Sequence, residues 1–366
     1  MMKGDTRVRW WRTKFGKAEA SAAANAIMKG NISQGEITAR FEERVGKILE
    51  IDNVVATANG SAALMMALMV LEVGIGDEVI VPNRSWIATA HAIHILGAIP
   101  VFADVEAKSP VISVRGLGKL ISDRTKAIIP VHLNGRSADM AGIRRFADRY
   151  GLAVIEDAAQ AFFSRNSQGF LGTQSEVGCF SLSVAKIISS GQGGLLITKS
   201  RKTADRLREV RTHGVENVKD PETWGEAPGL NFRLTDIQAA VGLVQLGKLS
   251  KKVAKLIRIY ELYSDHLDRV PGLSVIPVSV ETGEVPIYME ILCEDRAQLI
   301  ASLGEMGIET RPFVPNLARA PYFNAEDHRY ENSQVFHEHG LTLPSGPGQS
   351  FSDIMRVTSA IQAIRR

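Results

Sequence analysis

The chain has 366 residues, of which 45% are hydrophobic and 23% are charged, and its formal net charge is +3. This composition is typical of a globular protein with one large domain and a smaller one. The charge excess is small and no lysine or arginine block or zinc-finger spacing occurs, so we expect no nucleic-acid partner. No apolar stretch is long enough to span a membrane, so we expect no membrane segment.

The first 50 residues are predicted to be mainly helical after a basic lead that contains Trp10 and Trp11. An alanine-rich run over 18–28 and apolar residues at helical spacing over 36–48 predict two helices. We expect the two tryptophans to anchor in the core; contact with a partner subunit or with the second domain is the alternative. The lead lacks the apolar core of a secretory signal, and we therefore expect a cytoplasmic protein.

A regular alternation of strand-like and helix-like segments follows from residue 54. Short apolar runs predict strands over 54–57, 78–81, 100–104, 127–133, 152–155, 178–182 and 195–198. Helical patterns separate several of them, over 62–71, 87–96 and 139–150. This order predicts an α/β fold with a mainly parallel sheet covered by helices on both faces. Residues 1–248 are expected to form the N-terminal segment and this large domain.

The remaining third of the chain has a different pattern. Helices are predicted over 202–211 and 237–246, on either side of a loop rich in Gly, Pro and charge over 213–229. Residues 249–366 are expected to comprise a linker helix over 249–267 and a smaller α+β domain. Its predicted strands lie near 273–276, 286–293 and 308–313, and its predicted helices near 296–306, 332–339 and 352–364.

Polar residues follow the strands of the large domain at the point where each strand ends. They are Asn59, Gly60, Ser61, Trp86, His132, Asn134, Asp157, Gln160 and Ser181. In parallel sheets, ligands bind beyond the carboxyl ends of the strands, so these residues are expected on one ligand-binding edge. The strand, Gly-Ser turn and helix around residue 60 offer backbone N–H groups and a positive helix end to a phosphate.

Lys186 lies in a small-residue stretch, CFSLSVAKIISSGQGGL, with apolar neighbours on both sides. An ammonium group is rarely buried without a function, because burial disfavours its charge. Desolvation lowers the pKa of a lysine and leaves an amine that can attack a carbonyl, as Schiff-base chemistry with pyridoxal phosphate requires. A surface lysine on a turn is the alternative interpretation. Cys179 and Cys293 lie in apolar runs and are expected as buried thiols, and no metal site is expected.

Seven ordered segments between residues 53 and 246 resemble the DegT/DnrJ/StrS family of pyridoxal-phosphate-dependent sugar aminotransferases. They are ANGSAALMMAL, GDEVIVPNRSWIATAHAI, GAIPVFADV, RTKAIIPVHLNG, VIEDAAQA, CFSLSVAKIISSGQGG and LNFRLTDIQAAVG. The resemblance implies the fold of the aspartate aminotransferase class (fold type I). It also implies a homodimer whose active sites lie at the subunit interface.

The same resemblance implies catalytic roles for two residues. Lys186 matches the lysine that binds the coenzyme aldehyde and then moves the proton during amine transfer. Asp157 matches the carboxylate that pairs with the pyridine nitrogen and keeps the ring able to draw electrons. For Asp157, a helix cap at a strand end is the alternative.

The coenzyme-binding residues also follow from the resemblance. Gln160 matches the neighbour of the coenzyme's phenolic oxygen, and Trp86 matches the aromatic residue stacked on the ring. Gly60, Ser61 and Ser181 match the phosphate-binding residues. Asn231 matches the residue that reaches the phosphate of the neighbouring subunit, and Arg233 either orients that loop or forms a structural salt bridge.

Three departures from the family pattern fall where substrate would be recognised: Gln192 replaces a frequent Glu, Asn134 a frequent Tyr, and Ala318 a frequent His. The segment 309–313 resembles members that aminate nucleotide-linked 4-keto-6-deoxy sugars. His132 and Arg311 are the expected substrate contacts.

We therefore expect an aminotransferase that moves an amino group from glutamate to a keto sugar, most simply a nucleotide-linked 4-keto-6-deoxy sugar. A ketocyclitol or a free keto sugar acid is an alternative acceptor. A dehydratase of the same family would carry His where Lys186 stands, and a non-enzymatic regulator would not need Lys186, Asp157, Gln160 and Ser181 together.

Overall fold

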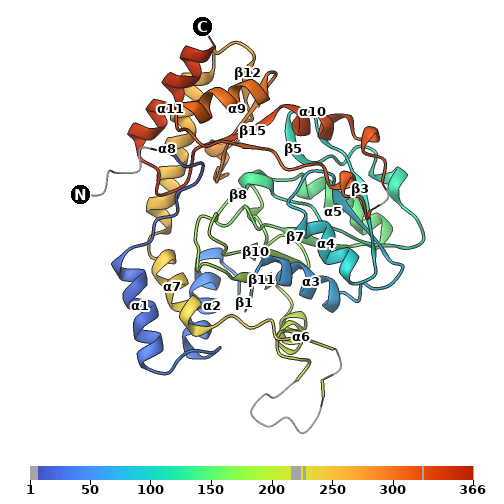
Figure 1. Cartoon of the computed structure of the whole chain (residues 1–366). Helices are drawn as coiled ribbons and strands as arrows, with labels where there is room; N and C mark the ends of the chain where they lie inside the picture. Colours follow the sequence, from blue (N-terminus) through green and yellow to red (C-terminus); the bar gives the residue numbers. More distant parts are fainter. Residues whose placement is uncertain (1–6, 216–223, 226–227, 324, 366) are drawn as a thin grey trace.

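The computed structural model describes residues 7–215, 224–225, 228–323 and 325–365. Figure 1 shows a central sheet surrounded by helices and a smaller unit above it, with the long helix α8 (Leu249–Leu267) running between the two. Part of the loop expected over 213–229 lies outside the described residues.

The central sheet has seven strands. Their order across the sheet is β1 (Asn53–Thr57), β11 (Gly194–Thr198), β10 (Val177–Ser181), β7 (Ala153–Asp157), β6 (Thr125–Ile128), β2 (Glu78–Pro82) and β3 (Ile99–Ala103). β11 is antiparallel to both of its neighbours, and the other neighbouring pairs are parallel. The predicted mainly parallel sheet is confirmed, and the carboxyl ends of the other six strands point to one edge.

Helices cover both faces of this sheet. α3 (Gly60–Val70), α4 (Ala88–Ile95) and α6 (Arg201–Arg211) share one apolar core with strand residues such as Val55 and Ile155. α2 (Glu36–Leu49), α5 (Met140–Tyr150) and α7 (Asp236–Leu246) pack on residues of the opposite parity, such as Val54 and Val154. Successive strand residues point to opposite faces, which explains why these strands are apolar throughout.

α7 also supplies a cap to a distant helix. Thr235 caps α7 itself through a capping box with Gln238. Asp236 instead accepts hydrogen bonds from the backbone N–H groups of Gly35, Ile37 and Thr38 at the start of α2. α2 has no side-chain cap of its own, because Gly35 occupies its N-cap position. A residue about 200 positions away therefore completes α2.

The second unit has a four-stranded antiparallel sheet of order β12 (Leu273–Val275), β13 (Met289–Cys293), β15 (Gly340–Leu343) and β14 (Arg311–Pro312). α9 (Arg296–Glu305), α10 (Glu331–His339) and α11 (Phe351–Ile364) accompany it. α8 joins the two cores, because Leu249 and Leu256 pack in the large domain and Ile259, Tyr263 and Leu267 in the small one. β15 was not predicted, and the strand expected over 308–313 is reduced to two residues.

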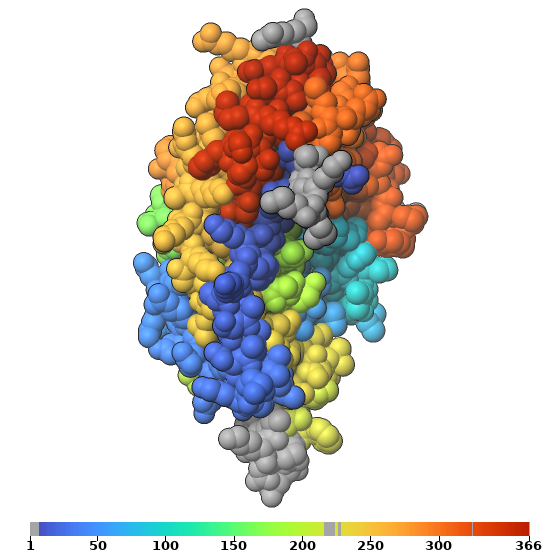
Figure 2. Space-filling model, turned by 60° about the vertical axis from the view of Figure 1, so that its left-hand side comes forward, coloured from blue at the N-terminus to red at the C-terminus, as the bar shows by residue number. Residues whose placement is uncertain are grey.

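The chain before α1 (Lys17–Met28) runs from the small unit to the large domain, and we call residues 7–15 the N-terminal strap. Val8 pairs with Ile308, Trp11 pairs with Ser345, and Val8 is buried in the small-unit core. Figure 2 shows this dark-blue segment on the surface below the red and orange small unit and beside lime-green atoms. Trp11 is 8% exposed and Trp10 is half-buried, and both rings pack against Tyr288 of the small unit, which is the alternative of contact with the second domain.

The remaining elements are short. They are the hairpins β4 (Val105–Glu106) with β5 (Ser109–Ile112) and β8 (Arg165–Asn166) with β9 (Gly169–Phe170), and the 3-10 turns Leu117–Leu120, Leu133–Gly135, Val280–Thr282, Leu317–Arg319 and Asp327–Arg329. The strand predicted over 127–133 ends at Ile128, because Pro130 has no N–H to continue the ladder. Both cysteines are buried and free. Among the described residues, no helix is long and apolar enough to cross a membrane and no cluster of metal-ligating side chains occurs.

Candidate active site

Lys186 lies in the loop between β10 and β11, and backbone hydrogen bonds within this loop close it on itself. Leu182 donates its N–H to Gly193 and accepts one from Ser190, and Lys186 donates its N–H to Ser183. The side chain of Lys186 is largely enclosed, and this burial lowers its pKa from 10.5 to about 8. The carboxylate of Asp157 opposes that shift, so the two predicted catalytic residues act on each other across the site.

Asp157 ends β7 beside Cys179 of β10 and is 4% exposed. Its Oδ2 accepts a hydrogen bond of 2.8 Å from the Thr89 hydroxyl, and its Oδ1 accepts one of 3.1 Å from the Ala159 N–H. Burial raises the pKa of Asp157, while these two donors and Lys186 lower it. No helix starts directly after Asp157, so Asp157 is not a helix cap. Its bond from the Ala159 N–H belongs to a turn. The carboxylate is held on two sides within a buried environment.

His132 is fully buried behind Asp157. Its backbone N–H donates to the Asp157 carbonyl at 3.0 Å. One ring nitrogen, Nε2, lies 2.9 Å from Oε2 of Glu156, and the other, Nδ1, accepts the Ala138 N–H at 3.2 Å. Both ring nitrogens therefore have protein partners. The ring is 0% exposed in this structure, and the role of His132 as a substrate contact stays a prediction.

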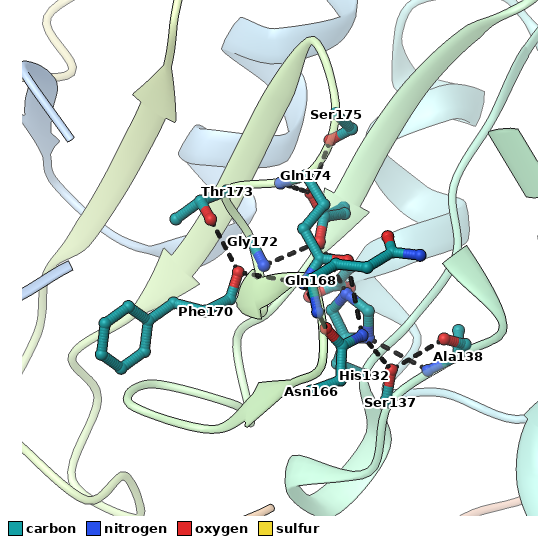
Figure 3. Close-up of polar contacts among 12 residues, drawn as sticks. His132, Ser137, Ala138, Asn166, Gln168, Phe170, Gly172, Thr173, Gln174 and Ser175 are labelled. Atoms are coloured by element: carbon teal, nitrogen blue, oxygen red, sulfur yellow. Dashed lines mark hydrogen bonds and ion pairs between the residues drawn. The ribbon is translucent and has the colours of Figure 1, made fainter. Parts of the chain in front are cut away.

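Glu156 joins His132 to the segment that precedes β10. Its oxygens accept the N–H groups of Gly172 and Gln174, both at 2.7 Å, and the hydroxyl of Ser175 at 2.8 Å. Figure 3 shows His132 beside Ser137 and Ala138, with Gly172, Gln174 and Ser175 of the segment before β10 on its other side. Burial would raise the pKa of Glu156, but the bond and the charge of His132 and the other donors outweigh burial and hold that pKa below 4.5. This network fixes the strand ends around Asp157.

Gln160 lies near the same strand ends, where its Oε1 accepts the Asn134 N–H at 3.0 Å. That contact leaves the amide nitrogen of Gln160 as the group available to donate. Asn134 has a left-handed backbone with φ of 55° and exchanges two bonds with the backbone of Tyr288 in the small unit. Asn134, where the family often has Tyr, thus ties the two units together beside Gln160.

The start of α3 lies against the end of β10. Asn59 caps the helix by accepting the Ala62 N–H at 2.8 Å, which leaves the N–H groups of Gly60 and Ser61 available. A Cβ on Gly60 would lie 2.9 Å from Cβ of Ser181, so only glycine permits this approach. The hydroxyl of Ser181 therefore lies beside the positive end of a helix, which is a geometry suited to an anion.

The other three predicted residues lie on the surface. Trp86 follows β2 at the same sheet edge, and 60% of its side chain is exposed. Asn231 is exposed, and its Oδ1 accepts a hydrogen bond of 2.9 Å from Nε of Arg233. Arg233 therefore orients Asn231. Arg311 is exposed on β14, stacked 4.3 Å over the ring of Trp10.

Three residues that contact the candidate site residues or the Lys186 loop could not be identified from the sequence pattern. Thr89 lies one residue inside α4 and three residues after Trp86, where helical spacing is the only signal. Glu156 is adjacent to Asp157 but points to the other side of its strand. Tyr288 donates its hydroxyl to the carbonyl of Ala185 at 2.9 Å from about 100 residues away, and no local pattern marks it.

Comparison with known proteins agrees with this geometry. The model of the DegT/DnrJ/EryC1/StrS aminotransferase family matches residues 14–362. The GDP-perosamine synthase of Caulobacter vibrioides is 34% identical over 339 residues, which cover 91% of each chain. The GDP-perosamine synthase of Vibrio cholerae is 30% identical and covers 90% of this chain and 91% of its own. The solved structure of S. venezuelae DesV has a TM-score of 0.91 at 31% identity, covering 98% and 99% of the two chains.

Proposed function

The chain belongs to the DegT/DnrJ/EryC1/StrS aminotransferase family, and from this premise we propose that it is a pyridoxal-phosphate-dependent enzyme that transfers an amino group to the ketone of a nucleotide-linked sugar. The observation that carries the proposal is a largely enclosed Lys186 with a pKa of about 8, acting across the site on a buried Asp157. Relatives named for a GDP-linked product support a nucleotide-linked acceptor.

The residues at the sheet edge fit pyridoxal phosphate. The N–H groups at the start of α3 and the Ser181 hydroxyl would hold its phosphate, and Asp157 would pair with its pyridine nitrogen. The Gln160 amide would donate to its phenolic oxygen, and the exposed face of Trp86 would cover the ring. When bound, the coenzyme supplies an electron sink for the carbanion formed at the donor's Cα.

Lys186 has two tasks in this proposal. Its neutral amine would hold the coenzyme at the aldehyde carbon, whose oxygen would leave as water. When not bound in this way, Nζ would accept a proton from the donor's Cα and hold it for return. A pKa of about 8 leaves Nζ able to do both near neutral pH. Burial raises the pKa of Asp157 overall, and the hydrogen bonds from Thr89 and Ala159 work against that rise by favouring the carboxylate.

Glutamate is the proposed amino donor, and a homodimer is the proposed assembly. Asn231 supports the dimer, because its side chain is exposed and Arg233 holds it in a fixed direction. In a dimer it would reach the phosphate of the neighbouring site, so each site would need both subunits.

We also propose that the enzyme is soluble and cytoplasmic, because nucleotide-sugar metabolism takes place in that compartment.

Purified protein supplied with coenzyme should develop the absorbance band of lysine-bound pyridoxal phosphate. Lys186→Ala should abolish the band, and Lys199→Ala, which removes an exposed lysine, should keep it. Asp157→Asn should retain coenzyme but slow amine transfer by roughly 100- to 1000-fold, because the charge opposite the ring is lost. A wild-type protein that takes up no coenzyme would overturn the proposal.

The acceptor is tested separately. The enzyme with glutamate should aminate a nucleotide-linked 4-keto-6-deoxy sugar, which mass spectrometry detects as the amino sugar. Ketocyclitols and free keto sugar acids serve as the competing acceptors in the same assay. If one of these is aminated and the nucleotide sugar is not, the proposed aminotransferase reaction stands and the proposed acceptor is wrong.

A further inference from the structure

The loop that carries Lys186 is held from outside by side chains of three distant segments. The carbonyl of Val184 accepts the hydroxyl of Thr13 and, at 3.1 Å, the indole N–H of Trp11, which is shared with the Thr13 oxygen at 2.8 Å. The carbonyl of Ala185 accepts the phenol of Tyr288 at 2.9 Å. Three side-chain donors therefore engage the two carbonyls directly before the lysine.

A fourth donor engages the residue on the other side of the lysine. Lys252 of α8 is 5% exposed, and its Nζ donates to the Ile187 carbonyl at 2.9 Å. Nζ also donates to Gln245, which in turn contacts Glu19. The charged groups around the loop are thus Asp157 from β7, Lys252 from α8, and Glu19 behind Gln245.

The strap and Tyr288 form one packed unit that is bonded to the small unit. The rings of Trp10, Trp11 and Tyr288 contact each other, with centroids 5.4 to 6.2 Å apart. The strap is bridged to the small unit at Ile308 and Ser345, and Tyr288 directly precedes β13. A shift of the small unit would therefore pull on the carbonyls next to Lys186.

A carbonyl oxygen has two lone pairs, and Thr13 and Trp11 occupy both at Val184, so this carbonyl cannot also accept from a nearby ammonium. Its occupation removes a stabilising partner for the charged lysine and so favours the neutral amine. The donors also replace water, since the loop makes few backbone bonds of its own between Ser183 and Ser190. Losing a donor would admit water or free a carbonyl, and either change favours the ammonium form.

We propose that Trp11, Thr13 and Tyr288 are positioning residues that set the reactivity of Lys186 and couple it to the small unit. The inference rests on the proposed function for its consequence in catalysis, but the contacts belong to the protein chain alone. It assigns a role to the tryptophan-containing N-terminus, which the coenzyme-binding residues leave unexplained. A purely structural role would lower stability without altering the lysine.

The test is Tyr288→Phe, which keeps the ring and removes only the hydroxyl, and Thr13→Val, which removes a second donor near the surface. The matched control is Tyr260→Phe, whose hydroxyl accepts the Val278 N–H and does not touch the loop. Acetylation of Lys186 in the full-length protein is followed by peptide mass spectrometry from pH 6 to 11. Exposed Lys47 is the internal reference.

Both loop variants should raise the midpoint of Lys186 acetylation by roughly 0.5 to 1 pH unit, because the ammonium gains partners or water. The absorbance of lysine-bound coenzyme should titrate with a shift in the same direction. Tyr260→Phe should leave both midpoints at the wild-type value even if its melting temperature falls. If Tyr288→Phe does not fold, the acetylation midpoint of Thr13→Val alone decides the outcome.

The two proposals fail differently. Unchanged midpoints in both loop variants, with coenzyme bound and amine transferred, would overturn the positioning role and leave the proposed function standing. Shifted midpoints in a protein that never binds coenzyme would uphold the positioning of Lys186 and remove the aminotransferase proposal.

Discussion

The hydroxyl of Thr89 donates to Oδ2 of Asp157 at 2.8 Å, which ties the first turn of α4 to the end of β7. Ser85 lies 2.8 Å from the same hydroxyl, so a short relay of two hydroxyls ends on the carboxylate. Within the described residues, the Thr89 hydroxyl is the only side chain that donates a hydrogen bond to Asp157. Without it, the backbone N–H of Ala159 is the remaining donor to the carboxylate.

Thr89→Val should therefore raise the pKa of Asp157 further and slow amine transfer by roughly tenfold at neutral pH, the effect of losing one hydrogen bond to a charged group. Because the carboxylate ionises at higher pH, the acidic limb of the pH–rate profile should move upward. Thr38→Val is the matched control, since that hydroxyl donates to buried Asp236 far from the site. Equal effects of the two variants on the profile would contradict the assignment.

The rate of coenzyme capture should report the pKa of Lys186. With a pKa of about 8, the neutral amine fraction rises roughly tenfold from pH 6 to 7 and levels off above pH 9. An ordinary lysine would keep gaining to beyond pH 10. Stopped-flow absorbance, normalised to a lysine peptide that reacts with the same coenzyme, measures this. A rate that still rises tenfold between pH 9 and 10 would sink the prediction.

Glu156→Gln should cost about 3 kcal/mol of stability at pH 7, because it leaves His132 and three other donors without their anion. The folded pKa of Glu156 is lowered, so its contribution is fully present above pH 4.5 and is lost as the pH falls through the lower folded value. Urea unfolding should therefore show a variant deficit that shrinks below pH 4.5. Glu43→Gln, on the exposed face of α2, should show little change, and a deficit independent of pH would refute the assignment.

Gly60→Ala should weaken coenzyme binding by tenfold or more. The added Cβ would meet Cβ of Ser181 at 2.9 Å and push the start of α3 away from the phosphate-binding position. Gly74→Ala is the control, because its added Cβ meets nothing within 4 Å. Equilibrium titration with pyridoxal phosphate, followed by absorbance, separates the two. Equal affinity for both variants would show that this approach has no bearing on the coenzyme.

The central sheet could be predicted from the sequence because its strands are short and apolar and most are followed by a helix. Asp157 and Ser181 end β7 and β10, and Gly60 and Lys186 lie three and five residues after a strand, so chain order predicted their place at this edge while their roles stay proposals. Local order sufficed because the carboxyl ends of these strands all reach one edge.

The rest depended on contacts that local order does not encode. His132 also follows a strand, but position alone does not reveal that both of its ring nitrogens have protein partners. Tyr288 and Trp11 reach the lysine loop from the small unit and the strap. β15 was missed because a four-residue run after a helix resembles a helix end until its neighbours β13 and β14 are known.

The cap that Asp236 provides to α2 has a consequence for biosynthesis. When the ribosome has released residues 36–49, the carboxylate that completes their first turn has not yet been translated. That segment gains its full helical stability only after some 200 more residues have emerged, so nascent chains halted before Asp236 should expose an unfinished α2 to chaperones.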